Sequence, residues 1–154
     1  MTDVKLRIDD LDALEEAAEK CGLELRRDQK HYAWWGRYVG DSHAYGEHRP
    51  AEMGTCAHAL RLKGTTPRDG ASGPWEIGVV PAKDGKGFGL YFDTYGDAGA
   101  QLTRAVEQNA NKLRREYAAA VATKRAKKTL ARKGFVVSRE DLPGNRIRLK
   151  LRRR

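Results

Sequence analysis

The side chains best suited to chemistry in this chain are one cysteine and three histidines between residues 43 and 58. His43, His48, Cys56 and His58 are spaced H-x4-H-x7-C-x-H. Thiolate sulfur and imidazole nitrogen are ligands of zinc, which takes four of them in a structural site. This spacing matches no standard zinc motif, and a buried cysteine beside a hydrogen-bonded histidine is the simpler interpretation. We therefore expect no metal and no cofactor, and these four residues are the only candidate ligands.

The same cysteine supports a second hypothesis, a nucleophile with a histidine base. Residues two apart on one strand share a face, so Cys56 and His58 could touch, with Asp41 or Glu47 as the orienting group. Many proteins contain Cys-x-His by chance, so we expect no catalytic residues and a non-enzymatic protein. The glycine-rich stretch at 85–89 lacks the P-loop pattern and does not indicate a phosphate loop.

Aromatic side chains form a third candidate site. Tyr32, Trp34, Trp35 and Tyr38 surround Arg37. Aromatic rings on a sheet face can stack nucleic-acid bases, and an arginine among them can bind phosphate. Alternation along a strand puts the first two rings on one face and Trp35 on the other, so one set must build the core. Core packing is therefore the favoured interpretation of this cluster.

Charge is divided unevenly along the chain, and this is its most informative property. Residues 104–154 hold 17 Lys and Arg against 4 Asp and Glu, a net charge of +13. Residues 1–103 hold 13 against 17, a net charge of −4. Such asymmetry favours an anionic partner, which is nucleic acid, an acidic protein surface or an anionic membrane surface. Insertion into a membrane is not expected, because no run of about 18 apolar residues occurs.

The candidate anion-binding residues lie on two predicted elements. Lys124, Lys128 and Arg132 recur at helical spacing and form a ridge. The last strand alternates, with Ile147, Leu149 and Leu151 predicted to point inward and the cations outward. The full set is Lys124, Arg125, Lys127, Lys128, Arg132, Lys133, Arg146, Arg148, Lys150, Arg152, Arg153 and Arg154. A row of like charges needs neutralising, either by phosphates, by acidic side chains of a partner, or internally by Glu15, Glu16 and Glu19.

Hydropathy patterns predict the elements that would position these residues. Strands are expected at 4–8, 23–26, 31–35, 58–64, 75–80, 88–95, 135–139 and 146–152, and helices over 11–21 and about 97–133. The second helix would be roughly 55 Å long and would project or bend. Gly134 is expected to end it, and a Leu-Pro-Gly-Asn turn to join the last two strands.

Strands in runs beside segregated helices predict an α+β protein. We expect an antiparallel sheet with helices packed on one face, ferredoxin-like or TATA-binding-protein-like, followed by a long basic helix and a closing β-hairpin. The 154 residues fit a single domain, with a mildly acidic body over 1–96 and a basic part over 97–154. The charged start MTDVKLRIDD lacks a signal sequence, and two cysteines make no disulfide scaffold, so a cytoplasmic setting is expected.

Several segments together resemble a known family. The family pattern K-x-Y-x-W-Y/W-G-R-W/Y-V-G-D is matched by Lys30, Tyr32, Trp34, Trp35, Gly36, Arg37, Tyr38, Val39, Gly40 and Asp41. A later Gly-x-Cys-x-His is matched at 54–58, and segments 75–80, 91–96, 109–117 and 134–151 are also similar. The chain thus resembles, over nearly its whole length, the uncharacterised family called domain of unknown function 1257, which includes hypothetical chloroplast reading frame 35.

The resemblance implies a role but no chemistry. Genes of the family are often found beside AAA+ ATPases, which implies an accessory or adaptor protein. It also implies a family-motif surface made of Tyr32, Trp34, Arg37, Asp41, Cys56 and His58. The turn-rich insert at 64–74 and the extra arginines at 152–154 depart from the family pattern.

The sequence therefore predicts a non-enzymatic binding or adaptor protein. Its basic C-terminal third would engage an anionic partner, most plausibly nucleic acid, with RNA favoured over DNA and an acidic protein surface left open. An accessory subunit of a AAA+ ATPase system, with the aromatic segment 31–45 as its contact, is the alternative. A Cys-His enzyme or zinc site is the third hypothesis.

Overall fold

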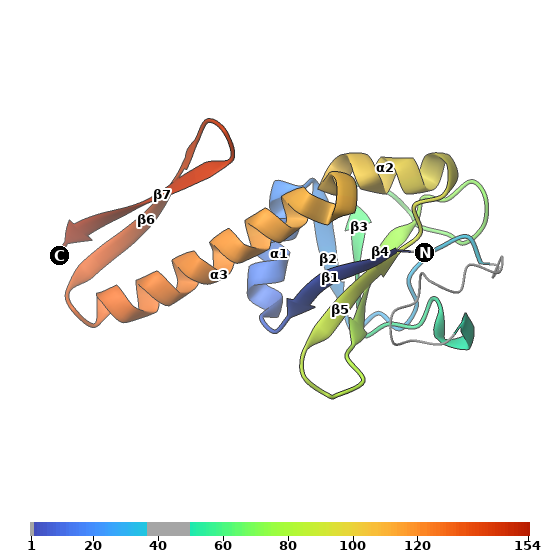
Figure 1. Cartoon of the computed structure of the whole chain (residues 1–154), viewed down its shortest axis with the longest axis horizontal. Helices are drawn as coiled ribbons and strands as arrows, with labels where there is room; N and C mark the ends of the chain where they lie inside the picture. Colours follow the sequence, from blue (N-terminus) through green and yellow to red (C-terminus); the bar gives the residue numbers. More distant parts are fainter. Residues whose placement is uncertain (1, 37–49) are drawn as a thin grey trace.

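A computed structural model describes residues 2–36 and 50–154 (Figure 1). Their helices are α1 (Leu11–Lys20), α2 (Gly96–Val106) and α3 (Asn111–Ala131), with short 3-10 turns η1 (Pro50–Glu52) and η2 (Gln108–Ala110). The strands are β1 (Thr2–Ile8), β2 (Leu23–Arg27), β3 (His58–Leu62), β4 (Glu76–Pro81), β5 (Phe88–Phe92), β6 (Phe135–Leu142) and β7 (Arg146–Arg153).

The first five strands form one antiparallel sheet in the order β1-β5-β4-β3-β2. Strands β2 to β5 are neighbours in chain order, whereas β1 and β2 lie at opposite edges, so the connection through α1 crosses the sheet. The predicted α+β class is confirmed. The β-α-β-β-β-β-α order differs from the β-α-β-β-α-β order of a ferredoxin-like fold. The TATA-binding-protein-like candidate stays a prediction.

All three helices pack on one face of this sheet. Leu14 of α1, Leu102 of α2 and Leu113 of α3 are fully buried with Leu60 and Leu90 of the sheet. Helix α1 begins where predicted, because Asp10 caps it: its Oδ1 accepts a hydrogen bond of 3.0 Å from the backbone N–H of Ala13. Within residues 2–36 and 50–154, no helix is long and apolar enough to cross a membrane.

The opposite face of the sheet is covered by an irregular segment, residues 28–36. The predicted strand over 31–35 is wrong, since only His31 forms an isolated bridge, with Thr55. The physical reason is Glu76 of β4. Its buried carboxylate accepts a hydrogen bond of 3.0 Å from the backbone N–H of Ala33, which in a strand would bond to the backbone of a neighbouring strand. The ring of Tyr32 then lies directly on Gly78.

The predicted long basic helix is confirmed as α3, but its predicted span over about 97–133 is wrong, because that stretch is two helices joined by η2. Glu107, Asn109 and Ala110 have φ angles of 67°, 56° and 55°, in the left-handed region that interrupts a helix. The break turns the chain so that Leu102 and Leu113, on separate helices, both reach the same core. No glycine or proline stands at the break, and the apolar stripe runs through it.

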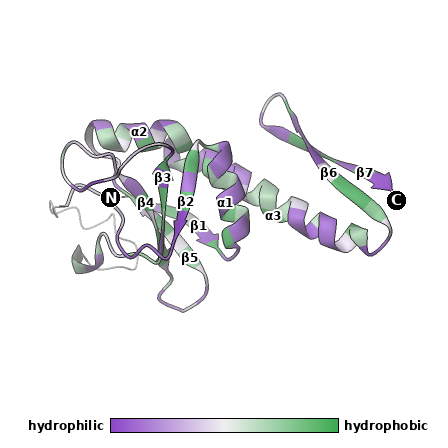
Figure 2. Cartoon of the chain, turned by 180° about the vertical axis from the view of Figure 1, so that it is seen from behind, coloured by the Kyte–Doolittle hydropathy of each residue, from purple (hydrophilic) through white to green (hydrophobic). Residues whose placement is uncertain are grey.

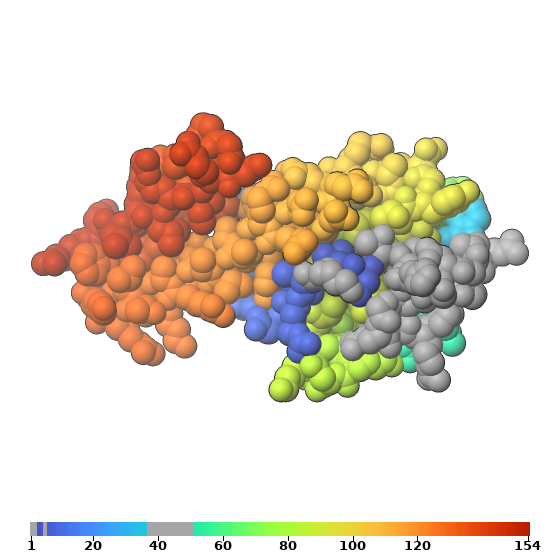
Figure 3. Space-filling view, viewed as in Figure 1, coloured from blue at the N-terminus to red at the C-terminus, as the bar shows by residue number. Residues whose placement is uncertain are grey.

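Helix α3 packs along α1 with its first half and then extends away from the sheet (Figure 1). Strands β6 and β7 form the predicted closing hairpin, which folds back over α3. We call residues 121–154, the second half of α3 with the hairpin, the arm. The space-filling view shows it as a projection at one end of the molecule (Figure 3).

The two faces of the hairpin follow from its register. Val137 lies opposite Leu151 and Asp141 opposite Ile147, on the face shared with Leu149. This face is turned toward α3 as predicted, because Val137 on it is buried and Arg139 on it pairs with Glu116 of α3. Its burial is incomplete, however, since Ile147 is 36% and Leu151 is 53% exposed. Figure 2 shows the start of β6 as hydrophobic, whereas hydrophilic residues dominate the end of α3.

The close approach of Tyr32 to the sheet gives a test of the fold. A Cβ at Gly78 would lie 2.3 Å from Cδ1 of Tyr32, so the ring must move. We expect Gly78→Ala to lower the free energy of unfolding by about 1–3 kcal/mol, as overpacking does. Urea unfolding measures this, with Gly89→Ala on β5 as the control, since its Cβ comes no closer than 3.0 Å to a ring of its own strand. Equal losses for the two variants would contradict the packing of Tyr32.

Candidate functional site

The Cys-x-His pair is tied to the backbone of residues 28 and 29 rather than to each other. The thiol of Cys56 donates to the carbonyl oxygen of Gln29 at 3.0 Å, and burial raises its pKa to about 12. Nδ1 of His58 accepts from the N–H of Asp28 at 2.9 Å, and burial lowers the pKa of the imidazole. The thiol therefore stays protonated, and Nδ1 of His58 is engaged by the backbone. Both observations favour a structural role for the motif over a nucleophile with its base.

The zinc hypothesis has no support among the described residues. Within 2–36 and 50–154, no three His, Cys, Asp or Glu side chains are grouped so that they could hold a metal ion. The remaining residues named for this site, His43 and His48, lie outside the described part of the chain, as do Asp41 and Glu47.

The aromatic cluster is mainly core. Tyr32 and Trp34 are 2% and 8% exposed, so the base-stacking interpretation is wrong for both. Trp35 packs edge-on against Trp75 and Tyr95, with ring centroids 6.2 and 5.5 Å away. Arg37 and Tyr38 lie outside the described residues.

The family-motif surface is corrected in the same way. Four of its members, Tyr32, Trp34, Cys56 and His58, are buried and hold the irregular segment on the sheet, so they form no surface. The other two, Arg37 and Asp41, lie outside the described residues. A packed layer requires large apolar rings. It also requires that buried polar groups, such as this thiol and imidazole, form hydrogen bonds with the backbone.

Sequence reasoning missed the charged group at the centre of this layer. Glu76 is 2% exposed, and its carboxylate accepts bonds of 2.9 Å from Gln29 and forms an ion pair of 3.3 Å with Arg61. The only signal in the sequence is one acidic residue in an otherwise apolar strand, WEIGVV. Both carboxylate oxygens of Glu76 bind groups of this protein, so the residue has a structural role.

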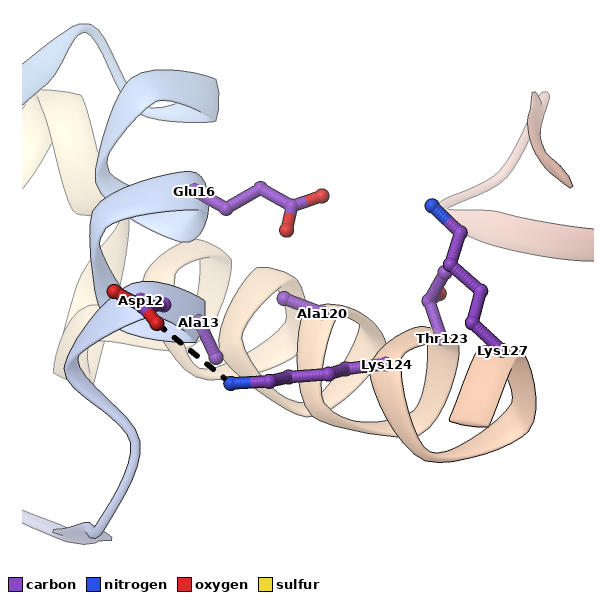
Figure 4. Close-up of a pocket in the computed structure, with 7 residues that line it drawn as sticks. All are labelled: Asp12, Ala13, Glu16, Ala120, Thr123, Lys124 and Lys127. Atoms are coloured by element: carbon purple, nitrogen blue, oxygen red, sulfur yellow. Dashed lines mark ion pairs between the residues drawn. The ribbon is translucent and has the colours of Figure 1, made fainter. Parts of the chain in front are cut away.

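The cations of the arm fall into two sets, of which the first is already neutralised. Nζ of Lys124 lies 2.8 Å from Oδ2 of Asp10 and 3.8 Å from Oδ2 of Asp12 (Figure 4). Asp12 and Lys124 border a small cavity of about 160 Å³ between α1 and α3, and Glu16 and Lys127 line it from opposite sides. Lys124 is therefore part of the attachment of the arm and not of a free ridge.

On the outer face of the hairpin, one carboxylate engages two further cations of the arm. Glu140 of β6 stands opposite Arg148 and forms ion pairs with it, at 3.5 Å, and with Lys150, at 3.2 Å. The cationic row of β7 is thus interrupted at its middle. The alternative of internal neutralisation by Glu15, Glu16 and Glu19 does not hold for two of the three, because Glu15 pairs with Arg27 and Glu19 with Lys63.

Arg139 of the arm pairs with Glu116 and Asp141, and the other remaining cations form no ion pair with any described residue. They are Arg125, Lys127, Lys128, Arg132, Lys133, Arg146, Arg152, Arg153 and Arg154. All but Arg146 stand between residues 125 and 133 or at the end of β7, which lie side by side because Phe135 pairs with Arg153 and the N–H of Arg154 donates to Gly134. Among the described residues of the predicted anion-binding set, the unpaired positive charge is therefore concentrated where the end of α3 meets the end of β7.

In comparisons with protein-family models, with curated proteins and with solved structures, nothing matched this chain. The resemblance to the family of domain of unknown function 1257 therefore stays a prediction that rests on the residues quoted for it.

The state of the thiols can be checked directly. Burial raises the pKa of Cys21 to about 11 and that of Cys56 to about 12, so little thiolate exists at about pH 8 in the folded protein. We expect an aromatic disulfide reagent to label both far more slowly in the folded than in the urea-unfolded protein. A Cys21→Ser variant isolates Cys56. Rapid labelling of Cys56 in the folded variant would restore the nucleophile hypothesis.

The attachment of the arm should depend on pH. The hydrogen bond from Lys124 lowers the pKa of Asp10 below its ordinary 3.8, and a carboxyl of this kind adds stability above its unfolded pKa and loses it as pH falls through the folded one. We expect Lys124→Met to lower Tm at neutral pH and to lower it progressively less as pH falls through the pKa of Asp10 in the folded protein, where the carboxylate becomes protonated. Lys128→Met, which removes an unpaired cation, serves as the control. An identical pH profile for both variants would count against the pair.

Proposed function

We propose that this protein is a non-enzymatic nucleic-acid-binding protein, with RNA as its foremost partner, that binds through the arm. The observation that carries the proposal is the set of nine arm cations without an ion pair among the described residues. Like charges repel, so their gathering needs a polyanion from outside, and release of counterions from phosphates supplies affinity.

The kind of cation supports phosphates as the ligand. Six of the nine are arginines, whose planar guanidinium donates two parallel hydrogen bonds to a phosphate. They are distributed over a helix and the adjoining strand instead of being gathered at one point. A spread of this kind suits a ligand with repeated negative charges better than a single acidic side chain.

The alternative proposal, an accessory subunit of a AAA+ ATPase, keeps only the family resemblance as support. Its expected contact was the aromatic segment 31–45, and Tyr32 and Trp34 of that segment are buried. Exposed aromatic surface nearby is limited, within the described residues, to Tyr95 at 68% exposure. We therefore rank it second to the nucleic-acid proposal.

Fluorescence anisotropy with a labelled single-stranded RNA, at several salt concentrations, tests the proposal. For single strands the logarithm of affinity falls against the logarithm of salt with a slope of about −0.7 per phosphate contact. We expect the triple variant Arg125→Glu, Lys128→Glu, Arg132→Glu to weaken binding more than tenfold and to reduce the slope by about two.

The control carries the same change of charge on the body of the protein. Arg26→Glu, Lys30→Glu, Lys86→Glu replaces three exposed cations outside the arm. We expect this variant to keep most of the affinity and the original slope. Absence of binding at low salt, or equal weakening by the two triple variants, would overturn the proposed function. Duplex RNA and DNA of the same sequence, titrated in parallel, establish which nucleic acid is preferred.

A further inference from the structure

A cleft lies between the first half of α3 and the turn of the hairpin. The turn points back toward the body of the molecule (Figure 1). The volume of the cleft is about 620 Å³, within the range of sites for small molecules. One wall carries Arg115, Glu116, Ala118 and Ala119 of α3. The other consists of residues 141–147 with Arg139 of β6.

The carboxylates of this cleft are already engaged. Glu116 accepts a bond of 2.7 Å from Nη2 of Arg139, and Asp141 accepts one of 2.9 Å from Nε of the same guanidinium. Asp141 also pairs with Lys20 of α1 at 3.2 Å. Burial by itself would lower the pKa of Arg139, but these bonds outweigh it and raise the pKa, so the guanidinium stays charged.

Two arginines on the walls have hydrogen-bond donors that are not in use. Nη1 of Arg139 is buried and has no hydrogen-bond partner. A buried donor of this kind ordinarily has a partner, and a bound ion or ligand is one explanation for its lack of one. Arg146 is exposed and uses only its Nε, which donates to the carbonyl of Pro143 at 3.2 Å, so its two terminal nitrogens are available.

The apolar part of the walls limits what kind of anion fits. Ala118, Ala119, Leu142, Pro143 and Ile147 line the cleft beside the arginines. A fully hydrated inorganic ion gains nothing from such a surface, whereas an anion attached to a flat organic group buries it there. Guanidinium planes also stack on nucleobases.

We propose that this cleft binds a terminal phosphate together with its nucleoside, as at the end of a nucleic-acid strand. A phosphate monoester carries about −1.5 to −2 charges and three acceptor oxygens, against a single charge on an internal diester, so it is the better match for Arg146 and the unpartnered Nη1 of Arg139. Arg115, the third arginine of the cleft, is paired with Glu107. This inference rests on the proposed function for the source of its ligand. A free mononucleotide presents the same chemistry and is the other source.

The test compares two labelled RNA strands of one sequence, with a 5′-phosphate or a 5′-hydroxyl group, by anisotropy. We expect the phosphorylated strand to bind about tenfold more tightly, a difference of about 1.4 kcal/mol. Arg146→Ala should abolish that difference, whereas Arg152→Ala, which removes an unpaired arginine from the same face of β7 outside the cleft, should keep it.

A second variant fills the cleft without changing any charge. Ala118 is exposed on α3, and Ala118→Leu should abolish the preference for the 5′-phosphate while leaving the salt dependence of the hydroxyl strand unchanged. Equal affinity of the wild type for the two strands would overturn the terminal-phosphate inference and leave the proposed function intact.

If neither the 5′-phosphate nor the 5′-hydroxyl RNA binds, calorimetry with adenosine 5′-monophosphate tests the cleft independently of the proposed function. In that case the proposed function fails, and the cleft is judged by the mononucleotide alone. Binding of the monophosphate, but not of adenosine, with loss in Arg146→Ala would support the cleft with a free nucleotide as its ligand. Absence of heat with the monophosphate would overturn it.

Discussion

The position of the arm depends on the burial of the first half of α3 in the core, because the second half of the helix is not held in this way. Leu113 and Ala120 are buried in the common core, and the hydroxyl of Tyr117 both donates to the carboxylate and accepts from the N–H of Asp9. Beyond Ala120, the only fully buried side chain of the helix in the described structure is Thr123. Half of the helix is therefore fixed by apolar burial, and the other half is free to carry the hairpin away from the body.

Electrostatics then decides which side of the arm faces the body. Three ion pairs join the hairpin and the end of α3 to the helices at their base, through Lys124 with Asp10, Arg139 with Glu116, and Lys20 with Asp141. The exposed pairs of Lys124 and Lys20 contribute little each, but with the largely buried pair of Arg139 they act together on one orientation. The acidic start of α1 thereby neutralises the inner side of the arm and leaves its outer cations unpaired.

Local patterns in the sequence predict the elements well and their joins poorly. The closing hairpin and the glycine at 134, with φ of 82°, follow from alternation and from a residue that tolerates the left-handed region. The break after Val106 could not be predicted, because Glu107 and Asn109 adopt positive φ only under the demands of core packing. The role of Glu76 and the pairing of Lys124 with Asp10 likewise join residues 43 and 114 positions apart, which no local pattern records.

The hairpin connects the stability of the arm to the binding of a ligand. A two-stranded hairpin is marginally stable by itself, and Ile147 and Leu151 leave part of its apolar face exposed. It is kept in place by Val137, which is buried, and by the ion pair of Arg139 with Glu116. A ligand in the cleft contacts α3 and the hairpin at once, so it stabilises their contact by its binding free energy. The same cleft that recognises the ligand therefore also orders the surface that presents the cations.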